Sequence, residues 1–105
     1  MITIKTLNMP VYLVNTYNIH DLETYKNYPP HVAPLFTRYG ARLLAMEMNA
    51  ETLEGKAKTM TAIIEFPSVE TIQTMYNDPD YQAIIHLRHD STSDCTMTIL
   101  KAFKQ

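Results

Sequence analysis

Apolar and polar positions alternate in four short segments of the chain, as they do in half-buried β-strands. These segments are residues 11–18 (VYLVNTYN), 41–49 (ARLLAMEMN), 59–66 (TMTAIIEF) and 95–103 (CTMTILKAF). Pro67 ends the third segment, because proline has no N–H to donate to a strand ladder. We therefore predict four strands.

Between the first two strands, apolar residues recur at helical spacing. Asp21 is the expected N-cap, and Glu23 would meet the helix dipole in the first turn. Pro29 and Pro30 interrupt the pattern, so we predict two helical segments, the second beginning near Pro30. Gly40 would end the helix in a left-handed conformation. The face shared by these segments comprises Leu22, Tyr25, Tyr28, Val32, Leu35 or Phe36, and Tyr39.

A second helical region follows the third strand. Ser68 is the expected N-cap, and Asp78-Pro79 would begin a further helical segment that ends near Asp90. The order of elements is strand, helix, strand, strand, helix, strand. It predicts an α+β fold of the ferredoxin-like βαββαβ type, in which a four-stranded antiparallel sheet carries its helices on one face.

The predicted sheet is apolar on both faces. Strand alternation places Leu43 and Ala45 on the other face of the sheet from Met46. It likewise places Ile63 on the other face from Ile64. A sheet covered on one side only should be polar on the other, so we predict that a second copy packs on the open face. A convincing interface would bury roughly 800 Å² per partner. The alternative is a monomer with scattered exposed apolar side chains.

Composition limits the other possibilities. The 105 residues, 46% of them apolar, suit one domain, which we place at residues 10–105 after a flexible arm or edge strand at residues 1–9. A net charge of -2 argues against a nucleic-acid partner. Cys95 is the single cysteine, which fits a reducing, cytoplasmic location and excludes an internal disulfide. The apolar run near Pro10 is too short for a signal peptide or a membrane span.

Ordered short motifs resemble the DUF1330 family of the dimeric α+β barrel superfamily. Tyr39-Gly40-Ala41-Arg42 is similar to its YGG-R segment, with Ala41 in place of the second glycine. Leu53-Glu54-Gly55 resembles its LEG motif, and Ile64-Glu65-Phe66-Pro67-Ser68 its EFPS junction. The helical stretch from Tyr76 to Arg88 is similar to the family's WY.SPEYQ…R helix, and Pro29-Pro30 is a departure.

This resemblance implies a homodimer with a ligand cavity between sheet and helices. Relatives in the superfamily include cofactor-independent monooxygenases, muconolactone isomerases, haem-degrading enzymes and proteins with no known reaction. Fold alone does not choose among these activities.

Six residues are candidates for a ligand site. Arg42 and Arg88 stand among apolar neighbours, where a guanidinium suits a carboxylate or enolate. Tyr25 and Tyr81 would shape the cavity, and His31 or Glu54 would move a proton. The structural alternatives are a helix-end cation for Arg88, core tyrosines, a surface histidine, and a turn or ion-pair role for Glu54.

The sequence offers no sign of a metal or cofactor. His86 and His89 are three residues apart, but no third ligand accompanies them at a recognisable spacing. With only two glycines, no phosphate-binding loop is present. We expect Cys95 to be a buried, inert thiol.

These features give two main hypotheses of function. The first is a homodimer that binds a small, partly apolar, oxygen-bearing compound and catalyses cofactor-independent oxidation or isomerisation by proton abstraction beside a carbonyl. The second is a non-catalytic dimeric sensor, carrier or interaction module. A third, weaker alternative is haem handling.

Overall fold

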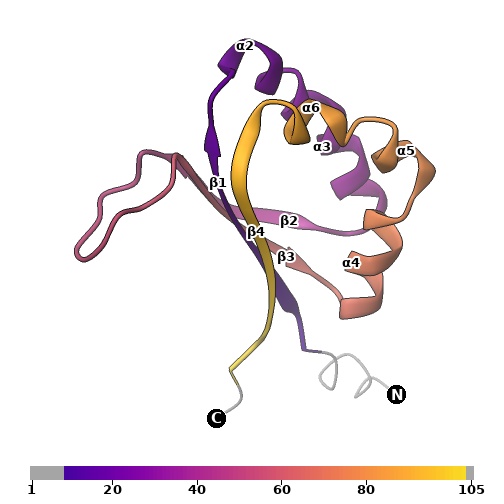
Figure 1. Ribbon diagram of the computed structural model, residues 1–105. Helices are drawn as coiled ribbons and strands as arrows, with labels where there is room; N and C mark the ends of the chain where they lie inside the picture. Colours follow the sequence, from indigo (N-terminus) through magenta and orange to yellow (C-terminus); the bar gives the residue numbers. More distant parts are fainter. Residues whose placement is uncertain (1–8, 104–105) are drawn as a thin grey trace, which may run out of the picture.

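The computed structural model describes residues 9–103, arranged as one sheet with all its helices on a single side (Figure 1). The strands are β1 (Val11–Ile19), β2 (Arg42–Met48), β3 (Met60–Phe66) and β4 (Thr92–Lys101). The helices are α2 (Leu22–Tyr25), α3 (Tyr28–Arg38), α4 (Val69–Tyr76), α5 (Pro79–Gln82) and α6 (His86–His89). The arm predicted at residues 1–9 lies outside the described residues, except for Met9.

The sheet is antiparallel throughout and its strand order is β2-β3-β1-β4. The two strands at the centre are therefore the first and the third in the chain, as in a ferredoxin-like βαββαβ unit. This confirms the α+β prediction. β2 and β4 form the two edges, and most of their side chains are exposed.

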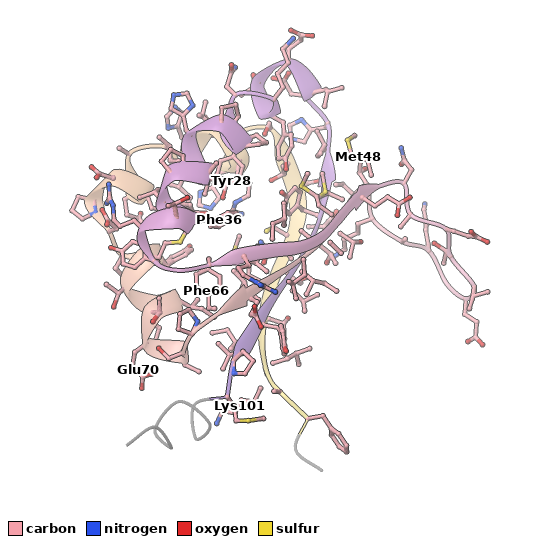
Figure 2. The ribbon with its side chains drawn as sticks, turned by 180° about the vertical axis from the view of Figure 1, so that it is seen from behind. Tyr28, Phe36, Met48, Phe66, Glu70 and Lys101 are labelled. Atoms are coloured by element: carbon pink, nitrogen blue, oxygen red, sulfur yellow. The ribbon has the colours of Figure 1, made fainter. Side chains whose placement is uncertain are left out.

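Strand alternation directs one face of the sheet toward the helices. On β3, Met60, Ala62, Ile64 and Phe66 are all buried, and their partners on β1 are Tyr17, Asn15, Leu13 and Val11. Val32 and Leu35 of α3 and Ile72 and Met75 of α4 complete the core. Figure 2 shows the labelled side chains of α3, Tyr28 and Phe36, between that helix and the sheet.

The first helical region divides earlier than predicted. α2 ends at Tyr25 and α3 begins at Tyr28, so both prolines lie in the first turn of α3. The N–H groups of a first turn have no partner inside the helix, and proline costs little there. Gly40 ends α3 as predicted, at a φ of 68°. The amides of Gly40 and Ala41 donate to Thr37 and Phe36, which forms a Schellman motif.

A bulge in β2 changes one predicted face. The register between β2 and β3 shifts between Leu43 and Ala45, so Leu44 is the extra residue. Leu43 pairs with Ile64 and therefore lies on the helix side together with Met46. The prediction that Leu43 lies on the open face is wrong, because one inserted residue reverses the alternation.

The C-terminal part also differs from the prediction in detail. The single segment expected from Pro79 to Asp90 is two short helices, α5 and α6. β4 begins at Thr92 and ends at Lys101, rather than covering residues 95–103. The earlier start follows from pairing, because Ile19 and Asn18 of β1 extend the ladder to Thr92 and Ser93.

Candidate functional site

Alternate residues of β1 bring one polar side chain into the apolar layer between sheet and helices. Val11, Leu13, Asn15 and Tyr17 all face the helices, and Asn15 lies in the middle of this row. Asn15 is only 7% exposed. A polar side chain in this position costs free energy of folding unless it is hydrogen-bonded.

A cavity of about 180 Å³ lies between α3 and the sheet. Asn15, Tyr17, Tyr25 and Tyr28 contribute its polar groups, and Val32, Ala33, Phe36, Leu43, Met46, Ala62 and Ile64 are among its apolar lining. Leu43 and Met46 are roughly half exposed, so the cavity opens toward the β2 edge of the sheet. A cavity of about 150 Å³ holds a benzene molecule, so this space suits a ligand with one small ring.

The amide of Asn15 is incompletely hydrogen-bonded. Its Oδ1 is buried and has no partner within residues 9–103. Native proteins leave few buried polar atoms in this state, and such an atom calls for an explanation such as a bound ligand or water. We therefore take Asn15 as the first residue of the candidate site.

Four tyrosines form two hydroxyl pairs in the same layer. The Tyr17 and Tyr25 hydroxyl oxygens are 2.7 Å apart, and so are those of Tyr28 and Tyr81. The rings also contact one another, with centroids 6.0 Å apart for Tyr25 and Tyr28. These side chains come from β1, α2, α3 and α5.

In each hydroxyl pair, one of the two phenol O–H protons has no acceptor within the pair. Two phenols share a single hydrogen bond, so one of the two O–H protons in each pair needs a further acceptor. Within residues 9–103, the other bond of Tyr81 comes from the Arg88 guanidinium, which is itself a donor. The tyrosine pairs therefore have more protons to donate than acceptors to receive them, and they match a ligand that carries a carbonyl or carboxylate oxygen.

Burial keeps these phenols protonated. It raises the pKa of Tyr17, Tyr25 and Tyr28 above the ordinary tyrosine value, with the paired hydroxyls adding to the effect at Tyr17 and Tyr28. A phenol with a raised pKa remains a hydrogen-bond donor at neutral pH. The free proton of each pair can therefore orient and polarise a carbonyl oxygen.

Arg88 lies beside the tyrosines and is 2% exposed. Its Nη2 donates to the Tyr81 hydroxyl at 3.3 Å, and the guanidinium carbon is 5.8 Å from the centre of the Tyr28 ring. Burial acts against the charge of Arg88, and the neutral Tyr81 hydroxyl accepts a hydrogen bond from it. Arg88 does not line the cavity under α3. It lines a neighbouring cleft of about 470 Å³ on the β4 side.

Cys95 differs from its prediction. It is exposed, and its sulfur accepts a hydrogen bond from Arg88 Nη1 at 3.0 Å. The expectation of a buried thiol is wrong, because Cys95 lies on the edge strand β4, whose helix-side face is only partly covered.

The structure brings three of the six predicted site residues together. Tyr25, Tyr81 and Arg88 are buried and belong to the layer described above. Arg42 instead forms a cross-strand ion pair with Glu65, with its Nε 2.9 Å from Oε1. The pairing register places both on the open face, away from the helices.

The two residues predicted to move a proton lie elsewhere. His31 is exposed on α3 and its Nδ1 contacts the Asn27 carbonyl oxygen of the preceding turn. Glu54 is exposed in the long loop between β2 and β3, which projects from the sheet in Figure 1. Neither residue lines the cavity under α3, so its geometry gives their role no support.

Sequence reasoning missed Asn15 and Tyr17. The signal was present, because Asn15 is the one polar residue in the row Val11, Leu13, Asn15 and Tyr17. A polar residue at an inward position of a central strand indicates either a buried hydrogen bond or a ligand contact.

The described part of the chain holds neither a cluster of metal ligands nor a membrane-spanning helix. No three metal-ligating side chains of residues 9–103 lie close enough to hold an ion. Over the same residues, no helix is both long and apolar enough to cross a membrane.

Solved structures share this architecture. A protein of unknown function from Rhodopseudomonas palustris is 22% identical, with a TM-score of 0.80, and the match covers 93% of this chain and 85% of that one. SnoaB, a cofactor-independent oxygenase from Streptomyces nogalater, is 12% identical with a TM-score of 0.68, covering 92% and 96%. A dimeric ferredoxin-like protein of unknown function from Thermobifida fusca is 10% identical with a TM-score of 0.64, covering 90% and 92%. At these identities, the likeness establishes the fold.

Sequence comparison identifies the family. No protein with a curated function matches the chain. Residues 10–103 match the domain of unknown function DUF1330, which confirms the resemblance of the short motifs. The chain belongs to the DUF1330 family, with a ferredoxin-like α+β fold.

Proposed function

We propose that this protein is a homodimer that binds a small, partly apolar, carbonyl-bearing molecule in the cavity between α3 and the sheet. The single observation that carries the ligand proposal is the phenol proton that the Tyr17–Tyr25 hydroxyl pair leaves without an acceptor in the wall of that cavity. The surplus phenol donors of the tyrosine pairs specify an acceptor oxygen on the ligand, and the apolar remainder of the wall suits a hydrocarbon ring or chain.

Homodimerisation is proposed from the open face of the sheet. Val14 and Ile63 are register partners on this face, and Leu100, next to Tyr12 across β1 and β4, is 50% exposed. All described helices lie on the other side (Figure 1). The apolar part of this face is best covered by a second copy, and dimeric ferredoxin-like proteins are among the structural neighbours.

We further propose, as the reaction class, isomerisation or a cofactor-independent oxidation in which molecular oxygen is the oxidant. One hydroxyl of the Tyr17–Tyr25 pair and the Tyr28 hydroxyl would donate to the carbonyl oxygen, and this polarisation makes the neighbouring C–H more acidic. The proposal is supported by the donor-rich layer and by the fold shared with a cofactor-independent oxygenase.

One observation favours the non-catalytic alternative. Neither His31 nor Glu54 lines the cavity, and the three phenols with raised pKa values are poor proton acceptors. A sensor or carrier needs binding without proton transfer. Binding and turnover must therefore be measured separately.

Binding is tested by calorimetric titration with two probes of the same shape. Acetophenone carries a carbonyl oxygen, and ethylbenzene does not. We expect acetophenone to bind at least about tenfold more tightly, because only it satisfies the free donors. Ala62→Leu should abolish binding by filling the cavity, whereas Ala45→Leu on the exposed β2 strand should not. Equal binding to Ala62→Leu and wild type would contradict the assigned site.

A further inference from the structure

The cleft on the β4 side of the molecule is separate from the cavity under α3. Its volume is about 470 Å³, and α4, α6 and β4 provide most of its walls. Met97 and Ile99 form part of an apolar wall, while Arg88, His89 and Cys95 supply polar groups. The cleft therefore offers one charged end and an apolar surface for the rest of a ligand.

Arg88 is a buried cation without a counter-charge. No carboxylate of residues 9–103 lies within ion-pair distance of it, although Arg38, Arg42 and Lys26 all have such partners. Its Nε is buried and has no hydrogen-bond partner among the same residues. A buried charge is costly unless it is paired, so an anion beside Arg88 would relieve an existing cost.

The local fold holds Arg88 firmly in this place. Its carbonyl oxygen accepts hydrogen bonds from the Thr92 hydroxyl at 2.6 Å and from the Ser91 amide at 3.2 Å, which join α6 to β4. Its Nη1 donates to Cys95 Sγ, and Cys95 is exposed. The guanidinium therefore contacts the sulfur of an exposed residue, and both residues line the cleft.

The composition of the cleft selects the class of anion. Arg88 is the only lysine or arginine in its lining, and the remaining polar groups, apart from His89, are neutral. One guanidinium matches one carboxylate, whereas a phosphate dianion needs more positive charge. We infer that this cleft binds a small organic carboxylate, with the carboxylate at Arg88 next to Cys95 and the apolar part on Met97 and Ile99.

Cys95 provides a specific reporter for this inference, because the chain has no other cysteine. Iodoacetate and iodoacetamide alkylate the sulfur by the same step: the C–S bond forms, the C–I bond breaks and iodide leaves. They differ in that only iodoacetate carries a carboxylate. The ratio of the two alkylation rates therefore measures how strongly the protein attracts the carboxylate of iodoacetate. The intrinsic reactivity of the thiol affects both rates equally and cancels in the ratio.

Mass spectrometry gives the rate at which each reagent alkylates Cys95. We expect the ratio of the iodoacetate rate to the iodoacetamide rate to be about tenfold higher in native protein than in urea-unfolded protein. Arg88→Met should lower it to the unfolded value, whereas Lys56→Met, which removes an exposed positive charge elsewhere, should not. Equal ratios in native and unfolded protein, or a folded Arg88→Met variant with the wild-type ratio, would overturn the inference.

A second measurement needs no variant. Hexanoate should slow iodoacetamide labelling of wild-type Cys95 in a saturable manner, and hexanamide, which has the same chain without the charge, should not. Equal protection by both compounds, or protection by neither, would overturn the carboxylate assignment. Cys95 does not line the cavity under α3, so failure here leaves the proposed carbonyl site standing.

Discussion

Asn15 is a polar residue of the candidate site whose burial costs stability. Its amide oxygen is buried without a partner, in contrast to Asn18 three residues later. The Asn18 side chain accepts a hydrogen bond from the Thr59 amide at 3.0 Å and donates one to Asp94 at 3.4 Å. The two asparagines of β1 therefore differ in how completely their side-chain amides are hydrogen-bonded.

This difference predicts opposite effects of the same substitution. Asn15→Leu should raise the free energy of unfolding by about 1 kcal/mol, because it removes an unsatisfied buried amide oxygen. Asn18→Leu should lower the free energy by about 1 kcal/mol, because it leaves the Thr59 amide unpaired. Urea denaturation measures both. A loss of more than about 2 kcal/mol in Asn15→Leu would show that the amide is satisfied in the native state.

Asp78 makes stability depend on pH in acid. The Tyr39 hydroxyl, the Asp80 amide and the Arg38 guanidinium all donate to its carboxylate, and they lower its pKa in that order. In the unfolded chain an aspartate has a pKa of about 3.9. The stabilisation is therefore complete above about pH 5 and is lost as the pH falls through the lowered folded pKa.

We expect Tyr39→Phe to weaken this acid dependence, since it removes the largest cause of the lowered pKa. Urea denaturation at about pH 6 and about pH 2.5 should show a smaller difference in stability for Tyr39→Phe than for wild type. Tyr12→Phe, on the opposite face of the sheet, is the control and should keep the wild-type difference. An unchanged difference in Tyr39→Phe would mean that another group causes the acid sensitivity.

At the scale of elements, local signals predicted where helices and strands begin and end. Ser68 and Asp78 cap α4 and α5 as expected, and Gly40 ends α3. The bulge at Leu44 could not be predicted, because it arises from pairing with β3 and has no signature in β2 itself. The division of this region into two helices was predicted, but its position was not, because α3 begins at Tyr28 and takes both prolines into its first turn.

Pro34 is the proline that α3 accommodates poorly. It lies in the interior of the helix, where it lacks the N–H that would donate to the carbonyl of Pro30, and it is exposed. Pro34→Ala should raise the free energy of unfolding by about 1–2 kcal/mol, with the restored hydrogen bond partly offset by a more flexible unfolded chain.

Pro29→Ala provides the matched comparison for this prediction. Pro29 lies in the first turn of α3, where no intrahelical hydrogen bond is missing, so the substitution should leave stability unchanged or lower it slightly. Thermal and urea denaturation of the two variants give the comparison. Equal effects at both positions would indicate that the missing N–H at position 34 carries no cost.

At the scale of the whole molecule, the candidate site is assembled from distant parts of the chain. Tyr25, Tyr81 and Arg88 could be selected from sequence because apolar spacing indicated that they face inward. Tyr25 pairs with Tyr17, and Tyr81 pairs with Tyr28, which come from other elements. These hydrogen bonds therefore depend on how α2, α3 and α5 pack on the sheet. Exposed residues such as His31 and Glu54 have no packing signal of this kind, and only their places in the chain, after the proline pair and beside Gly55, suggested a role in the site.

The proposed dimer predicts a specific mass. Sedimentation equilibrium at micromolar concentration should give twice the chain mass of 12.1 kDa. Val14→Glu should give the single-chain mass with an unchanged circular dichroism spectrum, because it places a charge on the open face without touching the core. Leu53→Glu, at a residue 97% exposed in the β2–β3 loop, should remain dimeric. A wild-type protein at 12.1 kDa would contradict the dimer.

The most direct test of the central claim, a carbonyl ligand between α3 and the sheet, is a methyl NMR titration of the wild-type protein with acetophenone. The account predicts saturable shifts of the Met46 and Ile64 methyl signals, which belong to the cavity wall, and constant signals from Ile63 and Leu100 on the opposite face. Shifts confined to Ile63 and Leu100, or no shift at any of the four residues at millimolar acetophenone, would contradict it.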